Sequence, residues 1–215
     1  MAEEILIKLK EAIIEMNKAK TLALTGSAIK DGIAMKDILQ GGLIPGIRTV
    51  GDLFNKGEYF LPELMVSGKI MGSAFNLLNE AFGRQETSYA GKFLIGTVKG
   101  DIHDIGKNIV IMMLKCNGWN VTDLGVDVSP DQFCAAVKDG DYNVLGMSSL
   151  LTMTIPSAAS TIKALKNAEL RDKIKIMIGG APVTQEYADQ IGADAYGKDA
   201  WEAVIKAEAL IHKIP

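Results

Sequence analysis

A carboxylate, a histidine and a glycine lie close together in the chain, in the order Asp101-x-His103-x-x-Gly106. His103 is one of only two histidines, and it follows an apolar run, 93–98, that is typical of a buried strand. An imidazole is a good ligand for a transition metal, and a carboxylate on its other ring nitrogen would orient the ring and raise its basicity. The pattern predicts a metal ligand, although an Asp-x-His pair taken alone is more often an ordinary surface pair.

Two further elements follow later strand-like runs in the same half of the chain. These are Ser148-x-Leu150 and Gly179-Gly180. Between Gly106 and Ser148 there are 41 residues, and between Leu150 and Gly179 there are 28. Each element alone is a weak signal; they follow the first, third and fourth predicted strands.

The second half of the chain alternates between apolar runs and segments of helical periodicity. The predicted strands are 93–98, 120–123, 144–148, 175–178 and 195–196, and the predicted helices are 106–117, 129–138, 155–168, 184–191 and 200–213. Because parallel strands need helical crossovers, these five units predict an α/β fold with a doubly wound, flavodoxin-like or Rossmann-type parallel sheet. Such sheets bind ligands at the carboxyl ends of strands where the strand order reverses, and the loop carrying His103 would lie there.

The first half of the chain has the periodicity of helices instead. Apolar residues recur at helical spacing over 5–16, less cleanly over 22–28, and again over 35–54 and from residue 62 onward, which predicts a four-helix bundle. Gly41, Gly42, Pro45 and Gly46 interrupt the third helix and indicate a kink or a close contact with another helix. The polar segment 84–91 is interpreted as a linker, so the predicted domains are 1–88 and 91–215.

The composition excludes several classes of protein. The chain has 215 residues, of which 48% are hydrophobic and 23% charged, as in a packed globular protein. The net charge of −3 and the lack of a basic run argue against a nucleic-acid partner. No apolar stretch reaches the roughly 18 residues of a membrane span. The acidic start, Met-Ala-Glu-Glu, is unlike a signal peptide, so we expect a cytoplasmic protein.

Other residues that could do chemistry have plainer interpretations. Cys116 and Cys134 have apolar neighbours and are expected to be buried thiols, with a disulfide or a metal site as the alternative. His212 is expected to be a solvated residue of the last helix. A metal-dependent phosphohydrolase would need several histidines, which this chain lacks. Lys107 and Asn108 begin a helix and are expected either to contact phosphate or amide groups of a ligand or to be solvated.

Taken together, the three elements resemble the pattern of the cobalamin-binding proteins in which a protein histidine binds cobalt and displaces the cofactor's own dimethylbenzimidazole. All three elements and both spacings agree with that pattern. Two segments of the first half, Val50-Gly51-Asp52-Leu53-Phe54 and Tyr59-Phe60-Leu61-Pro62, resemble the helical cap of the methyl-transferring branch. That branch includes cobalamin-dependent methionine synthase and the corrinoid proteins of methanogens and acetogens, and the resemblance covers essentially the whole chain.

The resemblance implies a role for each matched residue. His103 would be the lower axial ligand of cobalt, Asp101 would bond the other ring nitrogen, and Thr154 would extend that network. In a methylcobalamin cycle between Co(I) and Co(III), His103 would be released on reduction and take up a proton, which Asp101 would stabilise. Ser148 would bond the displaced base. The other implied cofactor contacts are Asp104, Ile105, Gly106, Leu150, Thr152, Gly179 and Gly180 in the second domain, and Phe54, Phe60, Leu61, Leu64 and Met65 over the upper face of the corrin.

The implied function is that of a corrinoid methyl carrier, a subunit of a multi-component methyltransferase system and not a complete enzyme. Its implied partners are a substrate-specific methyltransferase, a second methyltransferase that passes the methyl group to tetrahydrofolate or a thiol, and a reductive activase. Two alternatives are a cobalamin-dependent regulator, which would usually carry a DNA-binding domain, and the small subunit of an adenosylcobalamin mutase, which lacks the cap. The apolar cap residues fit a plain bundle core as well, and the sequence leaves the methyl donor open.

Overall fold

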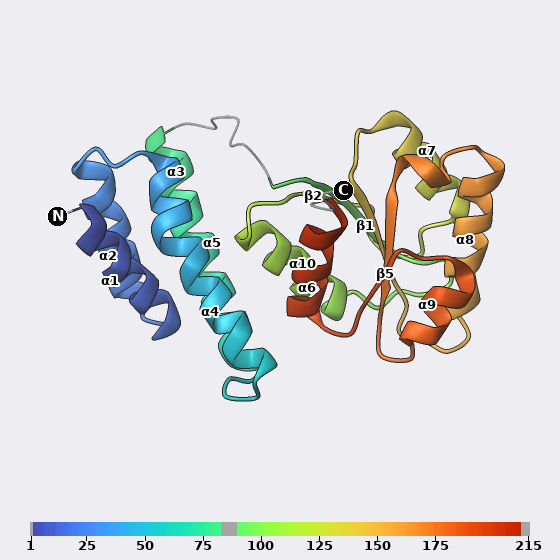
Figure 1. Ribbon diagram of the computed structural model, residues 1–215, viewed down its shortest axis with the longest axis horizontal. Helices are drawn as coiled ribbons and strands as arrows, with labels where there is room; N and C mark the ends of the chain where they lie inside the picture. The colour runs from blue at the N-terminus through green and yellow to red at the C-terminus, as the bar shows by residue number, and fades with distance from the viewer. Residues whose placement is uncertain (1, 83–89, 212–215) are drawn as a thin grey trace. The chain divides into compact units, whose positions relative to one another are not determined.

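The computed structural model describes residues 2–82 and 90–211. It divides into two compact units, one built from the N-terminal helices and the other from the α/β segment that follows. Figure 1 shows the elements of each unit, coloured from blue at the N-terminus to red at the C-terminus. Within the described ranges, no helix has both the length and the apolar character needed to cross a membrane.

The N-terminal unit is a helical bundle, as predicted. Its elements are α1 (Ala2–Ile14), α2 (Lys18–Lys30), α3 (Met35–Ile38), the π-helical turn η1 (Leu39–Leu43), α4 (Ile44–Asn55) and α5 (Leu61–Phe82). α3, η1 and α4 follow one another without a break and together form the third helix that the sequence predicts. α1 packs on α2 and α4, and α5 packs on the same two helices.

Glycines in the third helix allow it to approach α1 closely. A Cβ atom at Gly42 would lie 2.9 Å from the Leu9 side chain, and one at Gly46 would lie 2.8 Å from that of Ile13. The π-helical turn lies at this contact and directly precedes the helix that contains Pro45, whose missing N–H interrupts regular helical bonding. The predicted close helix contact is therefore confirmed.

The second unit is a five-stranded sheet with helical crossovers. Its elements are β1 (Lys92–Thr97), α6 (Ile105–Cys116), β2 (Asn120–Asp123), α7 (Pro130–Asp139), β3 (Val144–Ser148), α8 (Ile155–Asn167), the 3-10 turn η2 (Arg171–Lys173), β4 (Lys175–Gly179), α9 (Gln185–Ile191), β5 (Ala195–Gly197) and α10 (Ala200–Ile211). Every pair of neighbouring strands is parallel, in the order β2-β1-β3-β4-β5. The predicted doubly wound fold is confirmed, and the predicted ends agree within one residue wherever the chain is described.

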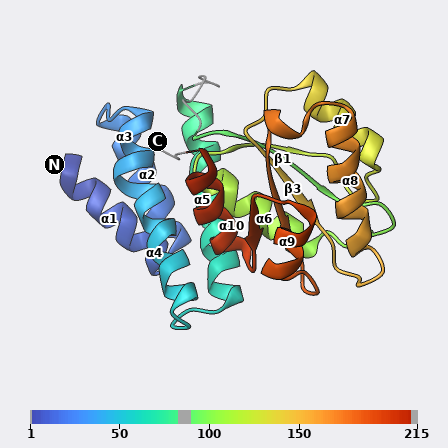
Figure 2. The ribbon, with the colours of Figure 1, turned by 45° about the vertical axis from the view of Figure 1, so that its right-hand side comes forward.

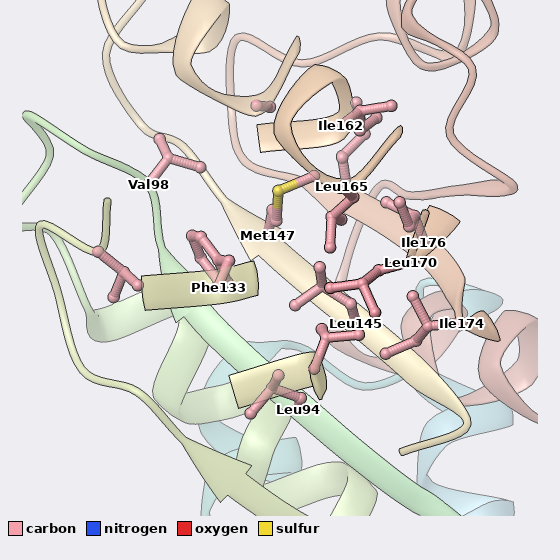
Figure 3. Packing of buried hydrophobic residues seen from close by; sticks show 14 of the residues in the cluster. Leu94, Val98, Phe133, Leu145, Met147, Ile162, Leu165, Leu170, Ile174 and Ile176 are labelled. Carbon is pink, nitrogen blue, oxygen red and sulfur yellow. The ribbon is translucent and has the colours of Figure 1, made fainter. Parts of the chain in front are cut away.

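Helices cover both faces of this sheet. α7, α8 and α9 lie on one face, whereas α6 and α10 lie on the other (Figure 1), and Figure 2 shows α7 and α8 side by side. On the first face, Leu94, Leu145 and Ile176 of adjacent strands pack with Phe133 of α7 and Ile162 of α8 (Figure 3). Burial of the central strands on both faces explains why they read as continuous apolar runs.

Some sequence predictions concern residues at the edge of what the structure describes. His212 and most of the predicted linker 84–91 lie outside the described residues.

Both cysteines are free thiols. Cys116 is buried, and that burial raises the pKa of its thiol to about 12. Cys134 is only partly buried, so the prediction of two buried thiols is wrong for it, because α7 packs on the sheet with one face and Cys134 lies at the margin of that face.

Candidate functional site

The candidate site lies at the carboxyl ends of β1 and β3, where the strand order reverses. The loop after β1 carries Asp101 and His103, and the loop after β3 carries Leu150 and Thr154. These strands are neighbours in the sheet although their loops are about fifty positions apart in sequence. The fold thus brings the first two motif elements together, as the sequence predicts.

Asp101 is the central residue of the site. Its carboxylate is fully buried and accepts five hydrogen bonds. Oδ1 accepts from the backbone N–H of His103 at 3.0 Å and lies 2.7 Å from the Nδ1 atom of the same residue. Oδ2 accepts from the N–H groups of Leu150 at 2.7 Å and Leu151 at 3.1 Å, and from the Thr154 hydroxyl at 2.8 Å.

These hydrogen bonds decide the ionisation of Asp101. Burial by itself raises the pKa of the carboxyl group, because it disfavours the charged form. The hydrogen bonds from His103, Leu150 and Thr154 outweigh burial and hold the pKa of Asp101 well below its ordinary value. Asp101 is therefore an anion at neutral pH. It accepts a hydrogen bond from the Nδ1–H group of His103 without taking the proton.

His103 presents its outer ring nitrogen for ligation. Its side chain is 45% exposed, although the carboxylate that holds it is buried. Because the Asp101 anion accepts at Nδ1, the neutral ring carries its proton there and keeps a free electron pair on Nε2. The arrangement offers one imidazole ligand to a metal, so it fits a metal that brings its other ligands with it.

The loop that carries His103 is braced by its neighbours. The Thr97 hydroxyl donates to the carbonyl of His103 at 2.9 Å, and the Ser157 hydroxyl of α8 donates to the carbonyl of Lys99 at 3.0 Å. Asp127, in the loop after β2, accepts from the N–H of Gly100 at 2.7 Å. A side chain on a loop that is held by backbone and side-chain bonds on several sides is oriented before any ligand binds.

Apolar side chains are exposed around this imidazole. Ile102 is 73% exposed, Ile105 is 75% exposed and Met153 is 90% exposed, and Leu150 and Leu151 are also exposed. Large apolar side chains that gather at one exposed site usually mark a binding surface.

At Gly106, in the first turn of α6, a Cβ atom would have no neighbour within 4 Å, so packing within the protein does not require a glycine there.

The Gly-Gly element lies beside the first two. Gly179, at the end of β4, pairs in register with Ser148 of β3. A Cβ atom at Gly179 would lie 2.9 Å from the carbonyl oxygen of Gly197, and one at Gly180 would collide with the carbonyl of Ser149. All three motif elements therefore meet at one edge of the sheet.

The remaining predicted site residues differ in their surroundings. In the α/β unit, Asp104 and Thr152 are exposed and Ser148 is partly buried. In the helical unit, Phe60 and Leu61 are exposed, Leu64 is buried, and Phe54 and Met65 are intermediate. Of these helical residues, Phe60 and Leu61 therefore have apolar surface to offer a ligand.

Lys107 is neither solvated nor free to contact a ligand. Its side chain is almost fully buried, and Nζ lies 2.6 Å from both carboxylate oxygens of Asp123 at the end of β2. Both alternatives that the sequence allowed for Lys107 are therefore wrong, because its buried ammonium group forms an ion pair with Asp123 of the edge strand β2. Asn108 is exposed, as one of its two alternatives expects.

Several residues of the site carry no motif signal. Asp127 and Ser157 brace the His103 loop, and Ser149, which is 2% exposed, lies 2.8 Å from the Thr154 hydroxyl through its own hydroxyl. The only signal for Ser149 is its place between the two specified residues of Ser148-x-Leu150. Asp127 has a positive φ of 54°, which no sequence pattern indicates.

Comparison with known proteins covers nearly the whole chain. Residues 91–205 match a family model described as a B12 binding domain, and residues 5–79 match a second model with the same description. A dimethylamine corrinoid protein of Methanosarcina mazei is 41% identical over 97% of this chain and 97% of its own length. A cobalamin-binding protein of Desulfitobacterium hafniense has a TM-score of 0.82 at 29% identity, covering 95% of this chain and 98% of that one.

A chain in the solved methanol:cobalamin methyltransferase complex of Methanosarcina barkeri also has a TM-score of 0.82, at 30% identity, and the match covers 98% of this chain and 81% of that one. The fold and the site define a doubly wound α/β protein with one oriented, half-exposed imidazole and exposed apolar side chains at the carboxyl ends of its central strands. The matches name the family. The chain belongs to the cobalamin-binding corrinoid proteins that act as methyl carriers, and a corrinoid is its cofactor.

Proposed function

We propose that this corrinoid protein carries a methyl group between a substrate-specific methyltransferase and a second methyltransferase, with His103 as the lower axial ligand of cobalt in place of the cofactor's own base. The observation that carries the proposal is the 2.7 Å contact between buried Asp101 and half-exposed His103. Bound cobalt would supply the methyl chemistry by accepting and giving up the methyl group at its upper face.

Asp101 and His103 would control the lower face. With the proton held on Nδ1, Nε2 is free to ligate, and the Asp101 anion raises the basicity of the ring. Nε2 would take up a proton when it is not bound to the metal, and the adjacent carboxylate would balance the new charge. Thr154 would take part by donating to the second oxygen of Asp101.

The cofactor would lie over the edge where the three motif elements meet. Ile105 and Leu150 offer apolar surface, and the open space at Gly106 leaves room for a close approach. The hydroxyl of Ser148 would bond the displaced base. We assign the remaining contacts of this unit to Asp104, Thr152, Gly179 and Gly180.

The helical unit, residues 1–88, would act as a cap for the domain formed by 91–215. A reactive methyl group needs protection from water when no partner is present. The exposed side chains of Phe60 and Leu61 support this role, and Phe54, Leu64 and Met65 would complete the apolar surface. Methyl transfer would then require the cap to move away so that a partner can enter.

The names of the relatives suggest small methylated donors. The M. mazei relative is named for dimethylamine, and the M. barkeri complex acts on methanol. We propose a donor of this size, with the donor chosen by the partner methyltransferase, and an acceptor enzyme that uses tetrahydrofolate or a thiol. A reductive activase and a cytoplasmic location complete the proposal.

The test is the ultraviolet–visible spectrum of the protein loaded with methylcobalamin. The parent should show cobalamin with its own base displaced and a histidine bound, and His103→Ala should show the base displaced with no histidine. A variant of the other histidine, His212→Ala, should match the parent. Absence of bound cobalamin in the parent would refute the carrier function, and identical spectra for parent and His103→Ala would refute the ligand assignment alone.

A further inference from the structure

Ser149 lies at the inner end of a continuous chain of polar contacts that leads to His103. Its hydroxyl oxygen is 2.8 Å from that of Thr154, which in turn is 2.8 Å from Asp101 Oδ2. The other oxygen of Asp101 lies 2.7 Å from His103 Nδ1. Ser149, Thr154 and Asp101 are all buried, so water does not compete for these bonds.

The direction of this chain follows from counting protons. Thr154 has one hydroxyl proton, and both Asp101 Oδ2 and the carbonyl of Leu151 lie 2.8 Å from its oxygen. Two hydroxyl oxygens at 2.8 Å need one of them to donate, and the charged carboxylate is the strongest acceptor present. Ser149 has a second acceptor in the carbonyl of Leu151, but at the longer distance of 3.4 Å. The arrangement that satisfies the two shorter contacts has Ser149 donating to Thr154 and Thr154 donating to Asp101.

Removal of the Ser149 hydroxyl would change which acceptor the Thr154 hydroxyl favours. A hydroxyl that accepts a hydrogen bond becomes a better donor, so Thr154 donates more strongly to Asp101 while Ser149 donates to it. Without Ser149, the Thr154 proton is freer to turn to the carbonyl of Leu151. Asp101 would then have one hydrogen bond fewer on Oδ2, so the plane of its carboxylate, and with it the Oδ1 atom opposite His103 Nδ1, would be less firmly oriented.

The Gly-Gly element holds Ser149 in this position. The backbone N–H of Ser149 donates to the carbonyl of Gly179 at 3.0 Å. Gly180 has a φ of +131°, and any Cβ atom there would collide with the carbonyl of Ser149. The protein itself therefore requires a glycine at position 180, whatever ligand approaches this loop.

We propose that Ser149 is a positioning residue for the His103 ligand, held in place by Gly179–Gly180 and acting through Thr154 and Asp101. The inference rests on the proposed function for the role of His103 as a ligand, but the hydrogen-bond chain is formed by protein groups alone. Its effect is to keep the ring proton on Nδ1 and so to keep Nε2 available.

The experiment measures the ring tautomer of His103 in the full-length, metal-free protein by nitrogen-15 NMR with labelled histidine. The chain has only two histidines, so a His212→Gln variant assigns the spectrum. At a pH where the ring is neutral, the ratio of the Nδ1–H to the Nε2–H form should fall about fivefold in Ser149→Ala, the effect of about one net hydrogen bond. Thr154→Val should lower the ratio at least as much, and the double variant should equal Thr154→Val because Ser149 acts through Thr154.

Ser160→Ala is the matched control, since the Ser160 hydroxyl donates only to the Pro156 carbonyl of its own helix. It should keep the parent ratio. A parent ratio in Ser149→Ala, or an equal fall in Ser160→Ala, would overturn the proposal. Gly180→Ala should reproduce Ser149→Ala, and Ser149→Ala alone decides the matter if the glycine variant does not fold.

The cobalt-loaded protein separates this inference from the proposed function. In the parent loaded with cob(II)alamin, electron paramagnetic resonance should show splitting by one axial nitrogen, and that splitting should weaken in Ser149→Ala. If the parent shows no histidine splitting while the tautomer ratios follow the expected order, the ligand assignment fails and the positioning chain stands. Unchanged tautomer ratios with normal splitting would leave the ligand assignment intact and remove Ser149 from it.

Discussion

The carboxylate of Asp101 lies 2.7 Å from Nδ1 of His103, and it is fully buried while the imidazole is half-exposed. The two residues come from one loop, but the second carboxylate oxygen accepts only from the loop after the neighbouring strand, at Leu150, Leu151 and Thr154. The orientation of the His103 ring is therefore set jointly by two loops, and changes in either one should alter it.

Replacing Asp101 with asparagine should destabilise the protein and reduce the fall of its free energy of unfolding at low pH. Asparagine cannot accept all five hydrogen bonds, so we expect a loss of about 1–3 kcal/mol in the free energy of unfolding at pH 7. The pKa of Asp101 is lowered on folding from its ordinary value of 3.8. Its ionised form therefore stabilises the fold fully above about pH 4, and this stabilisation is lost as the pH falls further.

Urea unfolding at pH 7, 5, 4 and 3 measures this effect. The difference between parent and Asp101→Asn should shrink below pH 4, because the parent loses the contribution that the variant never had. Asp139→Asn, which changes an exposed carboxylate of α7, is the control and should stay parallel to the parent. A constant difference over the whole range would contradict the assigned role of the carboxylate.

Gly106→Ala should separate cofactor binding from folding. No atom lies within 4 Å of a Cβ at this position, and alanine favours the helix over glycine by up to about 1 kcal/mol, so the metal-free protein should melt at the same or a higher temperature. If the corrinoid occupies this space, the added methyl group should weaken cobalamin binding about tenfold or more.

Thermal melting of the metal-free protein and spectroscopic titration with cobalamin give the two readouts for Gly106→Ala. Gly26→Ala is a matched control, since Gly26 lies within α2 and also has no neighbour within 4 Å of a Cβ. It should share the effect on melting and leave cobalamin affinity unchanged. Parent-like affinity in Gly106→Ala would place the cofactor elsewhere.

Lys107→Met should weaken the fold without changing the axial ligand. The variant keeps most of the buried stem of Lys107 but leaves Asp123 without its cationic partner. Because Asp123 is partly exposed and can be hydrated, we expect a cost of about 1–3 kcal/mol, below that of a fully buried broken pair. Chemical unfolding should record this loss, while the spectrum of the methylcobalamin-loaded variant should match that of the parent.

A lost histidine signal in Lys107→Met would show that the ion pair helps to place His103. Recovery of stability in a Lys107→Met, Asp123→Leu double variant would show that the cost of the single change comes from the stranded carboxylate. Failure to recover would point instead to lost packing of the lysine stem.

The sequence alone determined most of the secondary structure and the place of the site. Apolar runs between helical segments indicate the central strands β1, β3 and β4, because a strand buried on both faces is apolar almost throughout, whereas the edge strand β2 is polar at both ends. Asp101, Ser148 and Gly179 lie at the ends of the first, third and fourth strands, and the carboxyl ends of parallel strands share one edge of the sheet. The glycines at positions 42 and 46 indicated a kink or a close helix contact, and the structure shows the close contact.

Only the tertiary structure decided which partners these residues find. The spacing does not show that Asp101 accepts a hydrogen bond from Leu150 or that the hydroxyls of Ser149 and Thr154 are in contact. Nor does it show that Lys107 pairs with Asp123. Secondary structure follows from local periodicity, whereas these contacts join loops that are near in space and far apart in the chain. Their geometry depends on strand order and loop conformation, which no local pattern contains.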